Sequence, residues 1–272
     1  MRFRSLRQAA LIAFAGMSLS GAAVADTEGA RQELAPTGKV RIGVIDQNPV
    51  IVVKDKSTGK MTGLGIDLSR VFARDLGRPL EIVGFGSGRE LTEGMKAGRI
   101  DIGFLAYAPA RAKEVAFTPP MIEVESSYMV LGASPLKTIA DVDAKGVRIG
   151  AIAKSSQDFH LTKTVKNAAV VRIADGATAK GLEMLKSGAI DAFAGNTHRL
   201  SGALDKVPGA RMMPGRFFKA DYSMALPQGR PAAAAFATAF VERVKKDGTL
   251  AKAIAANTLY GVAVAPPAAG GQ

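Results

Sequence analysis

Two segments of the chain repeat each other, and this duplication constrains the fold more than any other feature of the sequence. VRIGV at Val40–Val44 recurs as VRIGA at Val147–Ala151, and each copy is short, apolar and β-branched, as in a buried strand. GMKAGRIDIGF, from Gly94, is matched by EMLKSGAIDAFA, from Glu183. Each copy of this second segment predicts a helix, a glycine that ends it, and a strand. Two matched units in the same order predict two similar α/β lobes.

Strands and helices alternate along both halves of the chain. The predicted strands are residues 40–45, 80–85, 100–105, 126–131, 147–152, 169–173, 190–194 and 222–226. The predicted helices are residues 67–76, 90–97, 156–166, 177–186, 231–246 and 249–257. Strands separated by helices favour parallel sheets with crossover helices. The Ala/Pro/Gly-rich end, residues 263–272, is expected to be disordered.

The first 25 residues have the pattern of a secretory signal peptide. Arg2, Arg4 and Arg7 precede a short apolar run, and Ala23-Val24-Ala25 is a small-x-small cleavage site. The apolar run is too short to span a hydrocarbon core of ~30 Å, which argues against a membrane anchor. We therefore expect a mature chain that begins at Asp26 and resides in a Gram-negative periplasm.

Composition excludes several classes of site. The chain has no cysteine and two histidines, so a disulfide framework, a thiolate metal site and a lipid-anchored cysteine are excluded and a histidine-rich zinc site is not expected. Without residues 1–25 there are 33 basic and 24 acidic residues, a formal charge of +9. These charges are scattered singly and are not interleaved with aromatic residues, so we expect no nucleic-acid partner and at most a bias toward anionic ligands.

Three segments carry a family resemblance. GLGIDLSRVFARDLG at Gly63–Gly77 resembles the signature of the family-3 (polar amino-acid type) periplasmic solute-binding proteins of ABC importers, although Gly65 stands where that signature usually has an acid. PARAKEVAFTPPM at Pro109–Met121 is similar to the family's "ERxKxVxFSxPY" stretch, and KKDGTLAKAIAANTLYG at Lys245–Gly261 resembles its closing helix. The resemblance extends over nearly the whole chain after the signal peptide.

The resemblance implies an α/β fold of the periplasmic binding protein type II class, with two similar lobes joined by two hinge strands and a ligand cleft between them. Lobe 1 would contain residues 39–129 and 225–262, and lobe 2 residues 132–221. The hinges would be Tyr128–Leu131 and Tyr222–Leu226.

The resemblance also implies a set of ligand-binding residues. Arg111 aligns with the family's arginine that holds the ligand α-carboxylate. An arginine suits this role because a guanidinium matches a carboxylate bidentately. Ser155 and Ser156 precede a predicted helix and offer hydroxyl and N–H groups to the same carboxylate, or act as plain helix caps. Asp46, with Gln47 and Asn48, follows the first strand, where loops face the cleft.

Other positions depart from the family pattern. Ala106 stands where a threonine usually binds ligand, Phe104 replaces a small residue, and Asn196 replaces the aspartate that pairs with the ligand ammonium. Either Asp46 supplies the missing carboxylate, or the ligand is a carboxylate without an ammonium group.

The predicted function is capture of a small carboxylate-bearing solute, an amino acid or related organic acid, for a membrane ABC permease. We expect a monomer without cofactor or metal ion. The alternatives are a ligand-sensing receptor and a periplasmic enzyme on the same scaffold, similar to cyclohexadienyl dehydratase. An enzyme would need a positioned acid or base; the candidates are Glu90, Glu123, Glu125, Asp158 and His198, and none lies in a catalytic motif.

Overall fold

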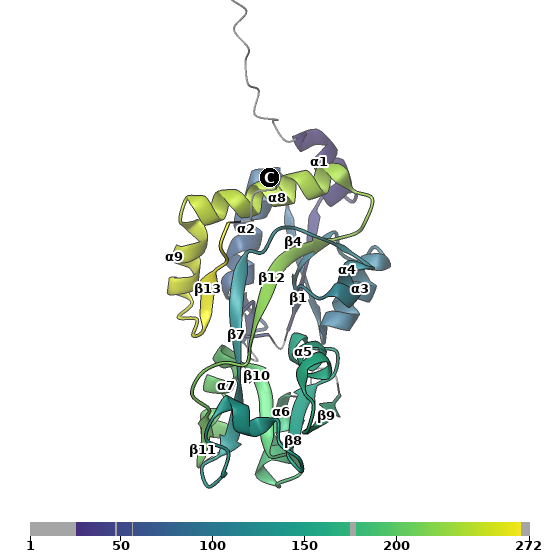
Figure 1. The fold of residues 1–272 in the computed structure, drawn as a ribbon. Coiled ribbons are helices and arrows are strands. Elements are labelled where there is room, and N and C mark those ends of the chain that lie inside the picture. Colours follow the sequence, from purple (N-terminus) through teal and green to yellow (C-terminus); the bar gives the residue numbers. More distant parts are fainter. Residues whose placement is uncertain (1–25, 47, 56, 175–177, 268–272) are drawn as a thin grey trace, which may run out of the picture.

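The computed structural model describes residues 26–46, 48–55, 57–174 and 178–267. The predicted signal peptide and Gln47 lie outside these residues. Within the described part, no helix is long and apolar enough to cross a membrane. Figure 1 shows two stacked lobes connected by long strands that run from one lobe into the other.

Lobe 1 is the larger and contains both ends of the described chain. Its helices are α1 (Thr27–Leu34), α2 (Leu64–Leu76), α3 (Gly88–Lys96), α4 (Pro109–Ala112), α8 (Pro231–Lys246) and α9 (Thr249–Ala256). Its strands are β1 (Val40–Ile45), β2 (Val53–Lys54), β3 (Met61–Thr62), β4 (Leu80–Phe85), β5 (Ile102–Ala106), β6 (Ala116–Phe117) and β13 (Val262–Val264).

Lobe 2 is built from the middle of the chain. Its helices are α5 (Ser156–Thr164), α6 (Thr178–Lys186) and α7 (Thr197–Ser201), with two 3-10 turns at Ile139–Val142 and Leu204–Lys206. Its strands are β8 (Arg148–Ile152), β9 (Ala169–Ile173), β10 (Ala192–Asn196) and β11 (Ala210–Met212). Two further strands, β7 (Ile122–Leu131) and β12 (Phe218–Leu226), connect the lobes.

One large sheet runs through both lobes in the order β4-β1-β5-β12-β7-β10-β8-β9. The predicted parallel pairing is confirmed in each lobe, because β1 is parallel to β4 and β5, and β8 is parallel to β9 and β10. β7 and β12 are antiparallel to their neighbours. The fold is the predicted two-lobed α/β architecture.

The connecting strands change partners where the lobes meet. In β7, Ser126 pairs with both Phe218 of β12 and Asn196 of β10, a little before the expected hinge segment that begins at Tyr128. In β12, Tyr222 pairs with Ile122 of β7 and with β5 of lobe 1, at the start of the expected segment. The two lobes therefore share a short antiparallel ladder.

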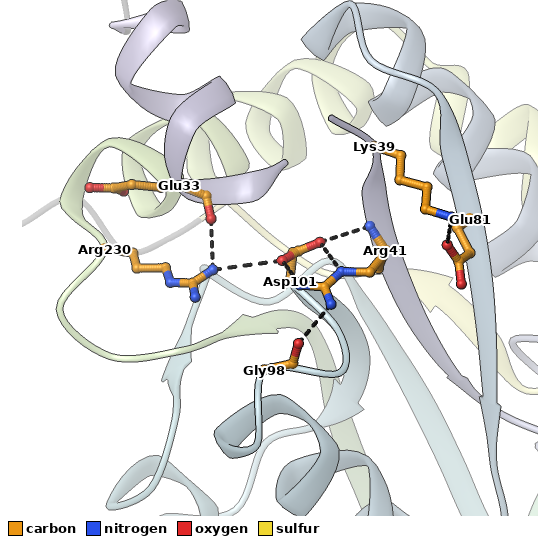
Figure 2. Close-up of polar contacts among 7 residues, drawn as sticks. All are labelled: Glu33, Lys39, Arg41, Glu81, Gly98, Asp101 and Arg230. Carbon is orange, nitrogen blue, oxygen red and sulfur yellow. Dashed lines mark hydrogen bonds and ion pairs between the residues drawn. The ribbon is translucent and has the colours of Figure 1, made fainter. Parts of the chain in front are cut away.

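The duplication seen in the sequence is present in three dimensions. In lobe 1, Arg41 donates from its backbone N–H, Nε and Nη2 to the Asp101 carboxylate at 2.9, 3.0 and 2.7 Å (Figure 2). In lobe 2, Arg148 makes the same three contacts with Asp191 at 2.8, 2.9 and 2.8 Å. The lobes differ in burial, because the Asp101 side chain is 0% exposed and that of Asp191 is 34% exposed.

The repeated VRIG segment requires a glycine in both lobes for the same packing reason. A Cβ at Gly43 would lie 2.4 Å from Ile100 Cδ1, and a Cβ at Gly150 would lie 2.4 Å from Ile190 Cδ1. Neither strand can carry a larger residue there unless its isoleucine moves. The repeated VRIG and Ile-Asp segments are thus one packing unit used twice.

The C-terminal segment is more ordered than predicted. Disorder was expected from residue 263, but Val262–Val264 form β13 on the edge of β7, and the Ala265 N–H donates to Met121 O at 3.0 Å. The alternating VAVA sequence suits an edge strand, because Val262 and Val264 pack against the core of lobe 1. The expectation is wrong for residues 263–265, and residues 268–272 lie outside the described part.

Candidate functional site

A pocket lies between the lobes. The ends of β1, β4 and β5 open onto it from lobe 1, and those of β8 and β10 from lobe 2. In open parallel sheets, ligands bind outside the carboxyl ends of the strands, where the connecting loops supply polar groups. Here two such edges face each other.

Arg111 lies at the junction of the two lobes. It is on the short helix α4, which starts with Pro109, and the whole residue is only 8% exposed. Its Nη1 donates to Ala106 O at 2.7 Å, and its Nη2 donates to Lys154 O of lobe 2 at 2.8 Å. The guanidinium also lies over the ring of Phe159 of α5, 5.3 Å from the centroid. This arginine therefore lines the pocket and connects the lobes.

Two helices begin at the pocket, one from each lobe. α3 starts after Ser87, whose hydroxyl accepts from the Glu90 N–H at 3.2 Å, and α5 starts after Ser155, whose hydroxyl accepts from the Asp158 N–H at 3.1 Å. Helix N-termini carry partial positive charge. Ser156, the first residue of α5, lines the pocket as well. The predicted serines are thus helix-starting residues placed beside Arg111.

The loop before α5 is held in an unusual conformation. Lys154 has φ +57°, the left-handed region that a lysine seldom adopts. Its N–H donates to Asp158 Oδ2 at 2.8 Å, and the same carboxylate pairs with Arg172 at 3.0 Å. These contacts fix the loop so that the Lys154 carbonyl accepts from Arg111.

Two predicted polar residues, Asn196 and Asn48, line the pocket beside Arg199 and Tyr222, which the sequence did not single out as ligand-binding residues. Asn196 was predicted to bind ligand; its Oδ1 accepts from the Arg199 N–H at 2.8 Å and so caps α7, and both residues line the pocket. Tyr222 of β12 also lines the pocket, and its hydroxyl accepts from Asn48 Nδ2 at 3.3 Å. Burial lowers the pKa of Arg199.

Two predicted ligand contacts lie elsewhere. Phe104 is 1% exposed and packs in the core of lobe 1, because β5 is buried along its length. Gly65 is next to it, where an added Cβ would lie 2.4 Å from Ile51 Cγ2, so a larger residue at position 65 would not fit beside these neighbours. Asp46 faces Lys54, 3.7 Å away, and does not line the pocket. Ala106, in contrast, lines it.

Charge is unevenly distributed around the pocket. Arg89, Arg111, Lys154 and Arg199 line it, and none of the described lining residues is Asp, Glu or His. The candidate acids and bases for catalysis all lie outside this lining: Glu90, Glu123, Glu125, Asp158 and His198. No group of three metal-ligating side chains occurs in the described part of the chain.

The fold and this interlobe pocket define a two-lobed ligand-binding protein of the periplasmic binding protein type II class. A family model places the chain more closely: residues 40–257 match the bacterial extracellular solute-binding proteins, family 3, and the chain belongs to that family.

A curated relative and several solved structures are similar to the chain. The ABC transporter glutamine-binding protein GlnH of Bacillus subtilis (strain 168) is 25% identical over 217 residues, 77% of each chain. The solute receptor for L-cysteine of Neisseria gonorrhoeae has a TM-score of 0.72 at 22% identity, with coverage of 86% of this chain and 95% of that one. ArgBP from T. maritima, as a mutant, gives 0.71 at 22% identity, with coverage of 84% and 99%. At this identity the solved structures show the fold alone.

Proposed function

We propose that this protein is a periplasmic substrate-binding protein that captures a small carboxylate-bearing solute, an amino acid or related organic acid, and presents it to a membrane ABC permease. The observation that carries the proposal is the convergence of Arg111 with the first turns of α3 and α5 at one pocket between the lobes. A guanidinium and two helix N-termini favour a carboxylate there.

Closure of the lobes gives the capture mechanism. A ligand held by Arg111 of lobe 1 and by Ser155 and Ser156 of lobe 2 stabilises the closed form, because it contacts both lobes only when they meet. Arg111 already reaches the Lys154 carbonyl across the junction, so the same side chain couples ligand binding to closure.

The export and delivery steps rest on the signal-peptide pattern and on the family. The predicted mature terminus, Asp26, caps α1 by accepting the Gly29 N–H at 2.9 Å. A helix cap at this residue is compatible with cleavage before it. The B. subtilis relative is named as an ABC transporter component, which supports a permease partner.

We further propose that the protein binds its ligand without converting it chemically. One structural neighbour is an ancestral amino acid-binding protein described as a precursor of cyclohexadienyl dehydratase, with TM-score 0.70 and 22% identity. In this chain three of the five acid and base candidates have partners outside the pocket lining or hold the backbone. Asp158 holds the α5 loop, Glu125 pairs with Arg216 at 3.0 Å, and His198 accepts from the Tyr260 N–H at 3.3 Å.

A thermal-shift screen followed by calorimetry tests the proposal. The mature protein is screened against amino acids, organic acids and small peptides, each beside its primary amide, because a ligand that binds the native state raises the midpoint. We expect at least one carboxylate to raise the midpoint more than its amide, and NMR of the recovered ligand to show it unchanged. A screen in which only uncharged compounds bind, or a ligand that is converted, would contradict the proposal.

A further inference from the structure

One edge of the connecting strand β7 is shared by the two lobes. β12 pairs with both Val124 and Ser126 on one edge of β7. On the opposite edge, Val124 pairs with Val262 of β13. On that same edge, Ser126 pairs with Asn196 of β10. β13 of lobe 1 and β10 of lobe 2 therefore lie end to end along β7, and they meet beside Glu125.

Hydrogen bonds connect the lobes at this meeting point. The Glu125 N–H donates to Gly261 O, just before β13, at 2.8 Å. The hydroxyl of Thr197, the first residue of α7, lies 3.2 Å from Glu125 O and 3.4 Å from Tyr260 O and shares its one proton between them. The Tyr260 N–H donates to His198 Nδ1 at 3.3 Å. α7 of lobe 2 is thus bonded to the C-terminal segment of lobe 1, residues 260–266.

The contact is packed too closely for a side chain on Gly261. This glycine has φ +66°, and an added Cβ would overlap Thr197 Oγ1 and lie 3.0 Å from Thr197 Cβ. Thr197 is itself only 3% exposed. α7 therefore has no room to move toward Gly261, and movement away from it breaks the hydrogen bonds to Tyr260.

Lobe 1 holds the C-terminal segment in place on the other side of this contact. β13 pairs with β7, and the Ala265 N–H donates to Met121 O at 3.0 Å. The Lys245 side chain of α8 is 6% exposed, and its Nζ donates to Pro266 O at 2.9 Å and to Pro120 O at 3.1 Å. A segment anchored in this way resists a displacement of α7 and does not follow it.

α7 connects this contact to the ligand pocket. Figure 1 shows α7 and α9 on one side of the connecting strands, and α3 and α5 on the other. On the pocket side, the lobes touch where Arg111 Nη2 donates to Lys154 O. Asn196 lines the pocket, and the next residue, Thr197, contacts the C-terminal segment. The two contacts therefore belong to one closed arrangement of the lobes.

We propose that Thr197 and His198, with Tyr260 and Gly261, form a clasp that holds the lobes closed and raises the affinity of the pocket without touching the ligand. Opening about β7 and β12 displaces α7, which either breaks the clasp bonds or presses Thr197 against Gly261, and both oppose opening. A ligand that contacts both lobes binds tightly only to the closed form, so its affinity falls with the closed fraction. The clasp does not depend on which ligand is bound.

Pulsed electron spin resonance of the ligand-free protein tests the clasp. Spin labels at Lys96→Cys on α3 and Lys163→Cys on α5 report the distance between the lobes. Thr197→Val keeps the shape of the side chain and removes the hydroxyl. A neutral hydrogen bond changes an equilibrium constant by about two- to tenfold, so the ratio of short to long distances should fall by about that factor. Thr197→Ser keeps the hydroxyl and should retain most of the short-distance component.

Thr118→Val is the matched control. Thr118 is 5% exposed, and its hydroxyl accepts from the Met224 N–H at 3.1 Å, within lobe 1. This variant should unfold at lower urea concentration and leave the distance distribution unchanged. His198→Phe removes the Nδ1 acceptor, serves if Thr197→Val does not fold, and should shift the distances in the same direction.

The outcomes separate the clasp from the proposed function. A ligand-free wild type without a short-distance component, or the same distribution in wild type and in the clasp variants, would overturn the clasp and leave carboxylate capture standing. An equal shift in Thr118→Val would also overturn it, because the fold as a whole would then have loosened. Failure of every carboxylate in the thermal-shift screen would overturn the proposed function and leave the clasp standing.

Discussion

Removal of the Arg111 guanidinium is the sharpest perturbation of the proposed carboxylate site. The residue is 8% exposed, and two of its nitrogens are held by carbonyl oxygens of different lobes, Ala106 O and Lys154 O. A carboxylate bound beside it in the closed pocket would lose its charged partner. Arg111→Ala should therefore weaken carboxylate binding by roughly 2–5 kcal/mol, about 30-fold to a few thousand-fold.

The same substitution also acts on the protein without ligand. Two backbone carbonyls lose a charged donor, so the free energy of unfolding should fall by about 1–3 kcal/mol, with the lower value if the open form hydrates them. Arg111→Lys should recover only part of the affinity, because an ammonium cannot reproduce the planar fork of a guanidinium.

Calorimetry with the tightest acid from the thermal-shift screen, beside urea unfolding of each variant, separates the two effects. Arg74→Ala is the control, because the Arg74 side chain is 72% exposed and pairs with Asp75 at 3.2 Å. Its affinity should stay within about twofold of wild type. Equal affinities of wild type and Arg111→Ala would refute the carboxylate site.

Other predictions concern packing and charge. Gly88→Ala should weaken ligand binding with little loss of stability, because the added Cβ would lie 2.9 Å from Arg111 Nη2, the end of a flexible side chain. Calorimetry measures the affinity and urea unfolding the stability. Asp101→Ala should cost about 3–5 kcal/mol of unfolding free energy and Asp191→Ala about 1 kcal/mol or less, because only the first carboxylate is fully buried; equal losses in urea would contradict this. Burial and a neighbouring glutamate raise the pKa of Asp221, so its ionisation reduces the stability of the protein as pH rises through that pKa. Asp221→Asn should therefore raise the melting midpoint at pH 7, and this gain should vanish at about pH 3.

Most of the fold was predictable because the sequence is locally consistent with it. The predicted strands at 40–45, 80–85 and 169–173 coincide with β1, β4 and β9, and the predicted helix at 231–246 coincides with α8. In these segments apolar periodicity and terminal signals agree. β13 was missed because its small, Pro-flanked residues resemble a disordered tail until β7 provides an edge to pair with.

The site was predictable only in part. Arg111, Ser155, Ser156, Asn196 and Ala106 are brought together at the pocket, because each follows or ends a strand whose end faces the cleft. Arg199, which the sequence did not reveal, lies on α7, whose five residues are too few for a periodic pattern. One signal could have found it: an asparagine that ends a strand caps a helix and fixes the residue three positions later.

Tertiary packing decided the remaining positions. Phe104 lies in a strand that contains both pocket-lining and core residues. Its neighbours in the sequence do not show whether its side chain faces the pocket or the core. The packing of the other lobe 1 side chains around Phe104 determines that it is buried.

Ligand-driven closure of the two lobes is tested most directly by a distance between them. Because the chain contains no cysteine, Lys96→Cys on α3 and Lys163→Cys on α5 place one spin label on each lobe, at exposed helix positions. Pulsed electron spin resonance should show a longer and broader distance without ligand, and a shorter, narrower one at saturating carboxylate. The Arg111→Ala variant should need about 30-fold or more ligand for the same change. An identical distance distribution with and without a ligand that calorimetry shows to be bound would contradict capture between the lobes.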